Sequence, residues 1–198
     1  MMHEVSAIIL AAGQSRRFGS HNKLYTPIDG KPMIIGVIER VLAAQPDQCF
    51  VVVSAQDKET VNLCLDFRVT AIPCADASLG MAHSLRAGAH AAPTTHGLMI
   101  VLGDMPFIRI STIERVITTA RNAHSENTIV MPFHEGRRGH PIVFGAGHRA
   151  NLLALEGDRG ANNLIADNPG QCTHVCLNDP GIHRDIDRPY DLESPTEV

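Results

Sequence analysis

Continuous apolar runs alternate with amphipathic segments along the first two thirds of the chain. The runs at 5–11, 49–54 and 97–102 are apolar almost throughout, as is typical of parallel strands buried on both faces. From Pro32 to Ala44 the apolar residues recur three and four positions apart, which predicts a helix that starts at the proline. The same criteria predict further helices at 57–67, 78–92 and 111–123, and further strands at 68–73, 128–133 and 172–177. This alternation predicts a three-layer α/β/α fold of Rossmann-like type with a mostly parallel sheet.

The pattern becomes less regular after residue 133. Before that point, Ser111 and Glu114 have the spacing of a capping box at the start of the helix predicted at 111–123. After residue 133 we expect only short elements: a strand at 142–144, helices at 148–156 and 161–166, and an extended segment or short strand at 183–187. No repeat, linker or low-complexity tract interrupts the chain, so we expect residues 1–198 to form one domain.

Composition and charge narrow the class of protein. The chain has 198 residues, of which 44% are hydrophobic and 19% charged, which is typical of a globular protein. A net charge of −4 provides no basic field for nucleic acid. No apolar run approaches the roughly 20 residues of a membrane span, and the N-terminus lacks the basic region of a signal peptide. The five cysteines are scattered and odd in number. We therefore expect a cytoplasmic protein with reduced thiols that binds neither nucleic acid nor a membrane.

The first predicted strand runs directly into a loop of small and basic residues. From Leu10 to Lys23 the sequence is LAAGQSRRFGSHNK. Small residues let backbone N–H groups approach a ligand, and arginine and lysine bind phosphate. The glycine spacing is neither that of a dinucleotide-binding GxGxxG loop nor that of a Walker loop. The loop therefore predicts a nucleoside triphosphate site, with an ordinary strand-to-helix connection as the alternative.

Acidic residues in two other places suit a divalent metal ion. Asp104 directly follows the strand at 97–102, and ligands of open α/β sheets bind where the strands end. If the segment near the C-terminus is extended, Asp185 and Asp187 lie on one face, and either can join Asp104 around one Mg²⁺. The alternatives are a structural turn at Asp104 and a solvated edge at the later pair.

Three further segments suit substrate contacts. Residues 136–141, GRRGHP, place two arginines between glycines, which suits an anionic second substrate or an exposed hairpin tip. Gly80 and Ser84 begin a predicted helix and suit contacts with a base edge, or ordinary helix capping. Residues 157–160, GDRG, either face the same cleft or form only a turn.

Taken in order, these segments resemble the signature of nucleotidyltransferases of the molybdenum cofactor type. LAAGQSRRFG, with Lys23-Leu24 and Pro27, resembles LAAGxSxRMG…KLL…P. Later segments resemble the GMxxSL, GDMP, GRRGHP, GDxGA and DIDTPEDL motifs, at residues 80–85, 103–106, 136–141, 157–161 and 185–192. The chain is most similar to the cytidylyltransferases, because guanylyl-transferring relatives carry LAGG and an Asp before the lysine, where this chain has Ala12 and Asn22. The chain departs from the signature at Phe18, Tyr25 and residues 188–190.

The resemblance implies a fold of nucleotide-diphospho-sugar transferase type and a Mg²⁺-dependent reaction. CMP would pass from CTP to the terminal phosphate of molybdopterin-type cofactor, with release of pyrophosphate, and a molybdoenzyme or its chaperone would accept the product. The methyl group of Ala12 would leave less room for a purine. The implied catalytic residues are Arg17, Lys23 and Asp104. The implied nucleotide contacts are Leu10, Ala11, Ala12, Gly13, Arg17, Lys23, Gly80, Ser84 and Asp104. The implied second-substrate residues are Arg137, Arg138, Gly139, His140 and Pro141, and the implied metal ligands are Asp104 and Asp187.

Other functions stay open at this point. The acceptor could be a sugar or alditol phosphate, or the nucleotide could be GTP. A dinucleotide-dependent oxidoreductase would need the GxGxxG motif that the loop lacks. A non-catalytic cofactor chaperone would not need both Asp104 and Asp187.

Overall fold

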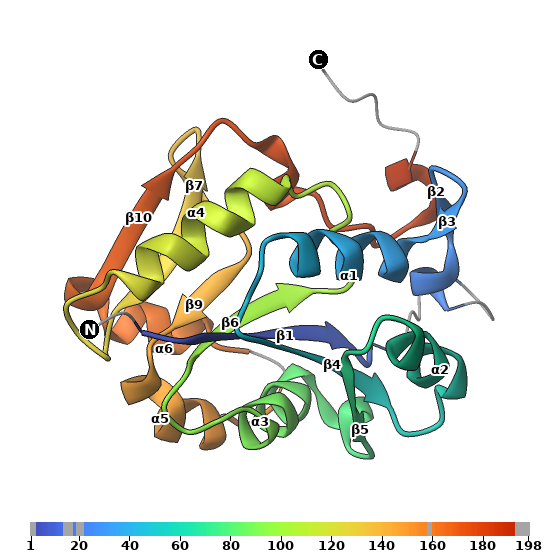
Figure 1. Cartoon of the computed structure of the whole chain (residues 1–198), viewed down its shortest axis with the longest axis horizontal. Coiled ribbons are helices and arrows are strands. Elements are labelled where there is room, and N and C mark those ends of the chain that lie inside the picture. The colour runs from blue at the N-terminus through green and yellow to red at the C-terminus, as the bar shows by residue number, and fades with distance from the viewer. Residues whose placement is uncertain (1–2, 14–17, 19–21, 158–159, 193–198) are drawn as a thin grey trace.

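The chain folds into a mixed, mostly parallel sheet with helices on both faces (Figure 1). This computed structural model describes residues 3–13, 18, 22–157 and 160–192. The strands are β1 (Val5–Ala11), β2 (Pro27–Ile28), β3 (Lys31–Pro32), β4 (Gln48–Ser54), β5 (Thr70–Cys74), β6 (Gly97–Leu102), β7 (Ile129–His134), β8 (Arg137–Arg138), β9 (Ile142–Phe144) and β10 (Cys172–Cys176). The α-helices are α1 (Met33–Ala43), α2 (Lys58–Asp66), α3 (Met81–Ala91), α4 (Ile110–Arg121), α5 (Arg149–Leu153) and α6 (Asn162–Asp167).

Strand β1 lies in the middle of the sheet, whose order is β10-β7-β9-β6-β1-β4-β5. It pairs in parallel with β4 and β6, so that Ile9 has Val51 on one side and Val101 on the other. Strand β9 is antiparallel to both of its neighbours, β6 and β7. The other strands of this path therefore run in one direction, and their carboxyl ends lie at one edge of the sheet. The small-residue loop begins at this edge, after β1, and Asp104 lies there as well, after β6.

The two faces of the sheet bury two separate hydrophobic clusters. Ile8 and Ile9 of β1 are both fully buried, and they belong to opposite clusters because successive strand residues point to opposite faces. Helices α1, α2 and α4 contribute to the cluster of Ile9, and helices α3, α5 and α6 contribute to that of Ile8. Figure 1 shows α1 and α4 on one side of the sheet and α3, α5 and α6 on the other. The predicted three-layer α/β arrangement is confirmed.

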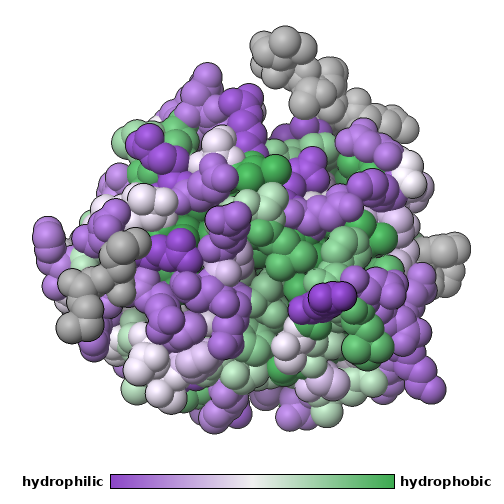
Figure 2. Space-filling model, in the orientation of Figure 1, coloured by the Kyte–Doolittle hydropathy of each residue, from purple (hydrophilic) through white to green (hydrophobic). Residues whose placement is uncertain are grey.

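Helix α1 is apolar around more of its circumference than the sheet covers. Glu39 and Arg40 are its only charged residues, and Ile35 and Leu42 are only partly buried. Figure 2 shows an apolar area over this helix, bordered by polar residues. Among the described residues, no helix is long and apolar enough to span a membrane.

Two helix starts differ from the prediction. Helix α4 begins at Ile110, with Arg109 at its N-cap position and no side-chain cap, so the predicted capping box of Ser111 is wrong. The buried carboxylate of Asp179 instead ties the start of α4 to the C-terminal segment, since it accepts hydrogen bonds from Arg109 N (3.0 Å) and Thr112 Oγ1 (2.5 Å). The helix predicted at 78–92 is divided at Gly80, whose φ of 133° is a conformation that favours glycine, into a 3₁₀ turn and α3.

Short strands and the C-terminal part also differ. The two-residue strands β2 and β3, which pair on either side of Asp29-Gly30, were not predicted. Of the two alternatives predicted at 183–187, the short strand is wrong: a 3₁₀ helix, Pro180–His183, leads into backbone without regular secondary structure. Hydrogen bonds to neighbouring loops replace strand pairing there, and these bonds build the site described below.

Arg149 fastens α5 to the end of α3. Its guanidinium donates hydrogen bonds to the carbonyls of Ala89 and Ala92, and to that of Pro93 at 2.9 Å. The last carbonyls of a helix have no partner within the helix, so these bonds satisfy groups that would otherwise lie unpaired near the core.

We therefore predict that Arg149→Met lowers the free energy of unfolding by about 2 kcal/mol, as expected for loss of hydrogen bonds from a charged group. Urea unfolding followed by circular dichroism measures this loss. Arg115→Met, at an exposed position of α4, removes the same charge and should change stability by less than about 0.5 kcal/mol. Equal losses in the two variants would contradict the role of Arg149.

Candidate functional site

The end of β6 packs closely against the end of β1. Gly103 N donates to the carbonyl of Leu10 at 3.0 Å, which continues the contact between the two strands beyond Leu102. A Cβ atom on Gly103 would lie 2.9 Å from this carbonyl oxygen, closer than real Cβ atoms come. Glycine at 103 therefore lets the ends of β1 and β6 approach each other. Asp104 follows at the edge of the sheet where the small-residue loop begins.

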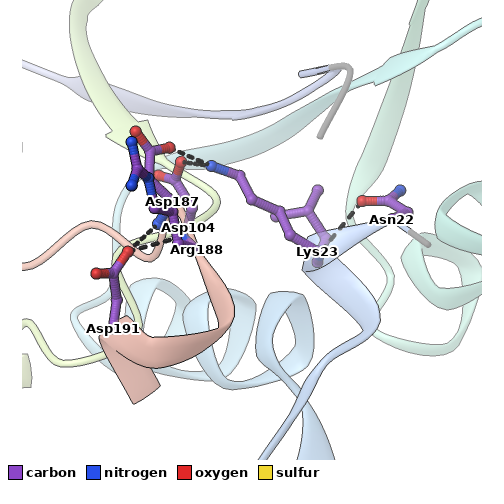
Figure 3. A network of polar contacts seen from close by, with 7 residues as sticks. Asn22, Lys23, Asp104, Asp187, Arg188 and Asp191 are labelled. Carbon is purple, nitrogen blue, oxygen red and sulfur yellow. Dashed lines mark hydrogen bonds and ion pairs between the residues drawn. The ribbon is translucent and has the colours of Figure 1, made fainter. Parts of the chain in front are cut away.

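Three residues that are far apart in the sequence meet at this edge (Figure 3). Lys23 Nζ lies 2.6 Å from Asp104 Oδ2 and 2.9 Å from Asp187 Oδ1. Lys23 belongs to a 3₁₀ turn, Lys23–Tyr25, after the loop. Of the two late aspartates, Asp187 is the one that meets Lys23, whereas Asp185 is exposed.

The cluster is partly withdrawn from solvent. The side chains of Lys23, Asp104 and Asp187 are 12%, 20% and 42% exposed. Burial alone would lower the pKa of the Lys23 ammonium, but its ion pairs and hydrogen bonds with Asp104 and Asp187 outweigh burial and raise that pKa above its usual value. Lys23 is therefore a permanent cation at neutral pH, held between the two carboxylates.

The residues present fit a divalent metal ion of the magnesium type. Asp104 Oδ1 is buried and has no hydrogen-bond partner in the described part of the chain. That part holds no group of three or more His, Cys, Asp or Glu side chains able to hold a metal. Two carboxylates with substrate phosphates are a common ligand set for Mg²⁺, which demands few protein ligands. Asp104 and Asp187 supply such a pair.

The segment from Asp179 to Asp191 ties this cluster to the rest of the site. Ile186 N donates to the carbonyl of Asp104 at 2.9 Å, and Ile182 accepts a hydrogen bond from His140 N at 3.1 Å. Asp191 Oδ2 accepts from the backbone N–H groups of Asp187 (2.9 Å) and Arg188 (2.7 Å), as Figure 3 shows. Asp191 therefore fixes the turn that carries Asp187. Its spacing of three residues after Arg188 is the sequence signal for this role, which sequence reasoning had not assigned.

The predicted second-substrate residues lie on and after β8. Arg137 and Arg138 are exposed, and Arg138 Nη2 donates to Asn162 Oδ1 of α6 at 3.0 Å. Gly139 is buried against Ile182, whose carbonyl oxygen would lie 2.4 Å from an added Cβ. Burial lowers the pKa of the His140 imidazole, and its buried Nδ1 has no partner among the described residues. His140 is followed by a cis bond to Pro141. Arg137 and Arg138 are thus two exposed cations that closely precede His140, whose backbone N–H is hydrogen-bonded to the segment that carries Asp187.

The start of α3 contacts the turn at 157–160. Ala82 N donates to the carbonyl of Gly157 at 3.2 Å, and a Cβ on Gly160 would lie 3.1 Å from Met81 Sδ. Ser84 is buried, 6% exposed, on the first turn of this helix. Two segments singled out in the sequence thus lie side by side.

The described part of the loop has a buried and an open portion. Ala11 and Ala12 are 2% and 4% exposed, and Ala12 belongs to the cluster that includes Leu85 of α3. Gly13 is exposed, and an added Cβ there would meet no atom within 4 Å. Arg17, the predicted catalytic arginine, lies outside the described residues.

Comparison with known proteins identifies the family. The model of the MobA-like NTP transferase domain matches residues 7–174. The chain belongs to this family. Membership assigns the protein to the NTP-dependent nucleotidyltransferases, and the matched range includes the loop, Lys23 and Asp104.

Several relatives of this MobA-like protein carry informative names. "Nicotine blue oxidoreductase" of Paenarthrobacter nicotinovorans is 26% identical over 92% of each chain. "Probable molybdenum cofactor guanylyltransferase" of Thermococcus sibiricus is 32% identical over 62% of this chain and 58% of the relative. A bifunctional GlmU protein of Caldicellulosiruptor saccharolyticus is 27% identical over 81% of this chain, which spans only 35% of that relative's length.

Solved structures share the fold. Rv0371c of Mycobacterium tuberculosis H37Rv is 22% identical and superposes with a TM-score of 0.82 over 98% of this chain and 100% of its own. A second structure of Rv0371c is a complex with manganese, at a TM-score of 0.77 over 97% of this chain and 100% of its own, with 22% identity. A 4-diphosphocytidyl-2C-methyl-D-erythritol synthase of Anaerococcus prevotii has a TM-score of 0.73 at 14% identity, covering 96% of this chain and 93% of its own. These likenesses confirm the predicted nucleotidyltransferase fold.

The close approach at Gly103 leads to a prediction. Gly103→Ala places a Cβ against the Leu10 carbonyl, so the ends of β1 and β6 must move apart. We therefore expect a loss of about 1–3 kcal/mol in the free energy of unfolding. Thermal unfolding by calorimetry measures it. Gly170→Ala is the matched control, since a Cβ there meets nothing within 4 Å. A Gly103→Ala protein as stable as the control would show that the approach is not tight.

Proposed function

We propose that this protein transfers CMP from CTP to the terminal phosphate of a molybdopterin-type cofactor and releases pyrophosphate. The observation that carries the proposal is the cluster of Lys23, Asp104 and Asp187 at the carboxyl ends of β1 and β6, where the small-residue loop begins. Family membership supports the NTP-dependent transfer. The name of the Thermococcus relative supports the link to molybdenum cofactor. The choice of CTP follows from the sequence resemblance.

The side chains of the cluster have separate roles in this proposal. Asp104 and Asp187 would hold Mg²⁺, which neutralises negative charge on the triphosphate and on the leaving pyrophosphate. The manganese complex of Rv0371c supports a divalent ion for the family. Lys23 adds a fixed positive charge beside these carboxylates, where charge accumulates as pyrophosphate leaves. Arg17 would add a second cation from the loop.

The acceptor needs positioning more than activation. A phosphate monoester is already ionised near pH 7, so the transfer requires no general base. The rate then depends on holding the acceptor in line with the α-phosphate of the nucleotide. Arg137 and Arg138 are exposed cations suited to an anionic acceptor, on a backbone joined through Ile182 to the segment of Asp187.

The proposed preference for cytosine is argued from Ala12, the residue that directly follows β1. The methyl group of Ala12 is buried in the cluster that includes Leu85 of α3, whose first turn carries Ser84. Compared with a glycine, this methyl group would take up room beside the loop. Less space there favours a pyrimidine over a purine, and Ser84 supplies a hydroxyl near the start of the helix.

A second candidate function is an oxidation–reduction reaction. The name of the Paenarthrobacter relative, which matches this chain over 92% of both, favours it. The loop lacks the GxGxxG motif, however, and the paired carboxylates around Lys23 suit a metal–polyphosphate complex better than a nicotinamide cofactor.

The metal assignment can be tested by binding. We predict that Asp104→Asn and Asp187→Asn each weaken Mn²⁺ binding in the presence of CTP by more than the roughly tenfold typical of losing an outer-shell partner. Electron paramagnetic resonance titration of free Mn²⁺ measures this. Asp185→Asn removes the same charge two residues away at an exposed position and should bind Mn²⁺ as the unaltered protein does. Weaker binding in Asp185→Asn alone would move the ligand from residue 187 to 185.

The substrates can be tested by a single matrix of assays. We predict that pyrophosphate release is greatest for CTP with molybdopterin when the four ribonucleoside triphosphates are crossed with molybdopterin and with sugar phosphates. A preference for GTP would overturn the role of Ala12, and a preference for a sugar phosphate would overturn the acceptor. Tight NAD(P)H binding without any nucleoside triphosphate binding would favour the oxidoreductase instead.

A further inference from the structure

The carboxylate of Asp57 holds one residue on each side of the site lysine, Asn22 before it and Tyr25 two positions after it. On one side of Lys23, Asn22 Nδ2 donates to Asp57 Oδ2 at 3.3 Å. On the other side of the turn, the Tyr25 hydroxyl donates to Asp57 Oδ1 at 2.5 Å. The 3₁₀ turn that carries Lys23 is therefore attached at both ends to one side chain from a different part of the chain.

Asp57 itself is firmly placed. It caps α2, because its Oδ1 accepts from Thr60 N at 3.0 Å, and its Oδ2 accepts from Thr60 Oγ1 at 2.9 Å. Thr60 is fully buried, and its Oγ1 also lies 2.7 Å from the Tyr25 hydroxyl. Asp57 N donates to the carbonyl of Ser54 at the end of β4. The anchor is thus built on the start of α2 and on the turn that follows β4, an interior strand of the sheet.

The Tyr25 hydroxyl is a lasting donor in this network. Burial raises the pKa of the Tyr25 phenol, and the hydrogen bond to Asp57 raises it further, so the group stays protonated throughout the neutral range. The bond is charge-assisted, since an ionised carboxylate accepts it, and bonds of this kind are stronger than those between neutral groups.

We infer that Tyr25 and Asp57 are positioning residues that aim the ammonium group of Lys23 at Asp104 and Asp187. The turn is short, so a shift of either end displaces Lys23 Nζ from contacts of 2.6 and 2.9 Å. For catalysis the inference rests on the proposed function, in which Lys23 acts on the triphosphate. The alternative is that the network stabilises α2 and the turn without affecting Lys23.

The first test measures the position of Lys23 without any substrate. The three lysines of the chain are Lys23, Lys31 and Lys58. Trace acetylation with acetic anhydride at fixed pH, followed by peptide mass spectrometry, gives the reaction rate of each amine. Lys23 should react slowest, since its side chain is 12% exposed and doubly ion-paired, whereas that of Lys31 is 55% exposed. Tyr25→Phe removes only a hydroxyl and leaves the cap of α2 intact, and it should raise the rate at Lys23 at least about threefold relative to Lys31.

The chain supplies a matched control for this variant. Tyr190 is its other tyrosine, at an exposed position, so Tyr190→Phe deletes the same atom and should leave all three rates unchanged. An unchanged ratio of Lys23 to Lys31 in Tyr25→Phe would overturn the inference. An equal rise at all three lysines would also overturn it, because that would indicate general loosening of the fold.

The second test asks whether Tyr25 acts through Lys23. In pyrophosphate release, Tyr25→Phe should lower kcat about tenfold, the effect expected for one hydrogen bond to a charged group. In the Lys23→Ala background the same substitution should have no further effect, since the group that it positions is absent. A tenfold loss that persists in that background would assign Tyr25 a role unrelated to Lys23. If no nucleoside triphosphate is turned over, the proposed function fails, while the acetylation test still decides the position of Lys23.

Discussion

The site depends on the attraction between one buried cation and two carboxylates that come from three distant parts of the chain. Lys23 follows the first loop, Asp104 follows β6, and Asp187 lies near the C-terminus. Without a cation between them the two carboxylates would repel each other, and their ion pairs with Lys23 keep the pKa of its ammonium above the usual value despite burial. The three side chains therefore hold one another in place. The fold supplies the contact by ending two adjacent strands, β1 and β6, at one edge and by leading the C-terminal segment back to it.

The sheet and helices were predictable because their signal is local and repeated. Continuous burial on both faces makes β1, β4 and β6 apolar at almost every position, and the spacing of apolar residues marks α1 as a helix. The position of Asp104 was predictable too, because it directly follows a buried strand. The contact with Lys23 was not, since 81 residues separate the two, and only the parallel pairing of β1 with β6 brings them together.

Other parts could not be predicted because side chains replace regular pairing there. Ser111 and Glu114 match a capping pattern, yet the carboxylate that holds the start of α4 is that of Asp179, which is 70 residues from Arg109 and 67 from Thr112. The segment at 183–187 alternates like a strand, but its backbone bonds to Asp104 and Asp191 rather than to a neighbouring strand. Such long-range bonds leave no periodic trace in the sequence. The nearest local signal is an aspartate at cap spacing, as at Asp57 and Asp191.

The contacts of Asp57 also bear on how the sequence signature is interpreted. Asn22, which differs from the guanylyl-transferring relatives, and Tyr25, which departs from the signature, both donate hydrogen bonds to this carboxylate. An aspartate at position 22, as in the guanylyl-transferring relatives of the resemblance, would replace this amide donor with a second carboxylate, which would repel Asp57 or have to share a proton with it. The amide of Asn22 therefore suits its contact with Asp57, independently of which nucleotide is bound. Ala12 has no such partner to account for it, because its methyl group only fills space beside α3. Of the two sequence features that distinguish this chain from the guanylyl-transferring relatives, Ala12 is therefore the one on which the proposed preference for cytosine rests.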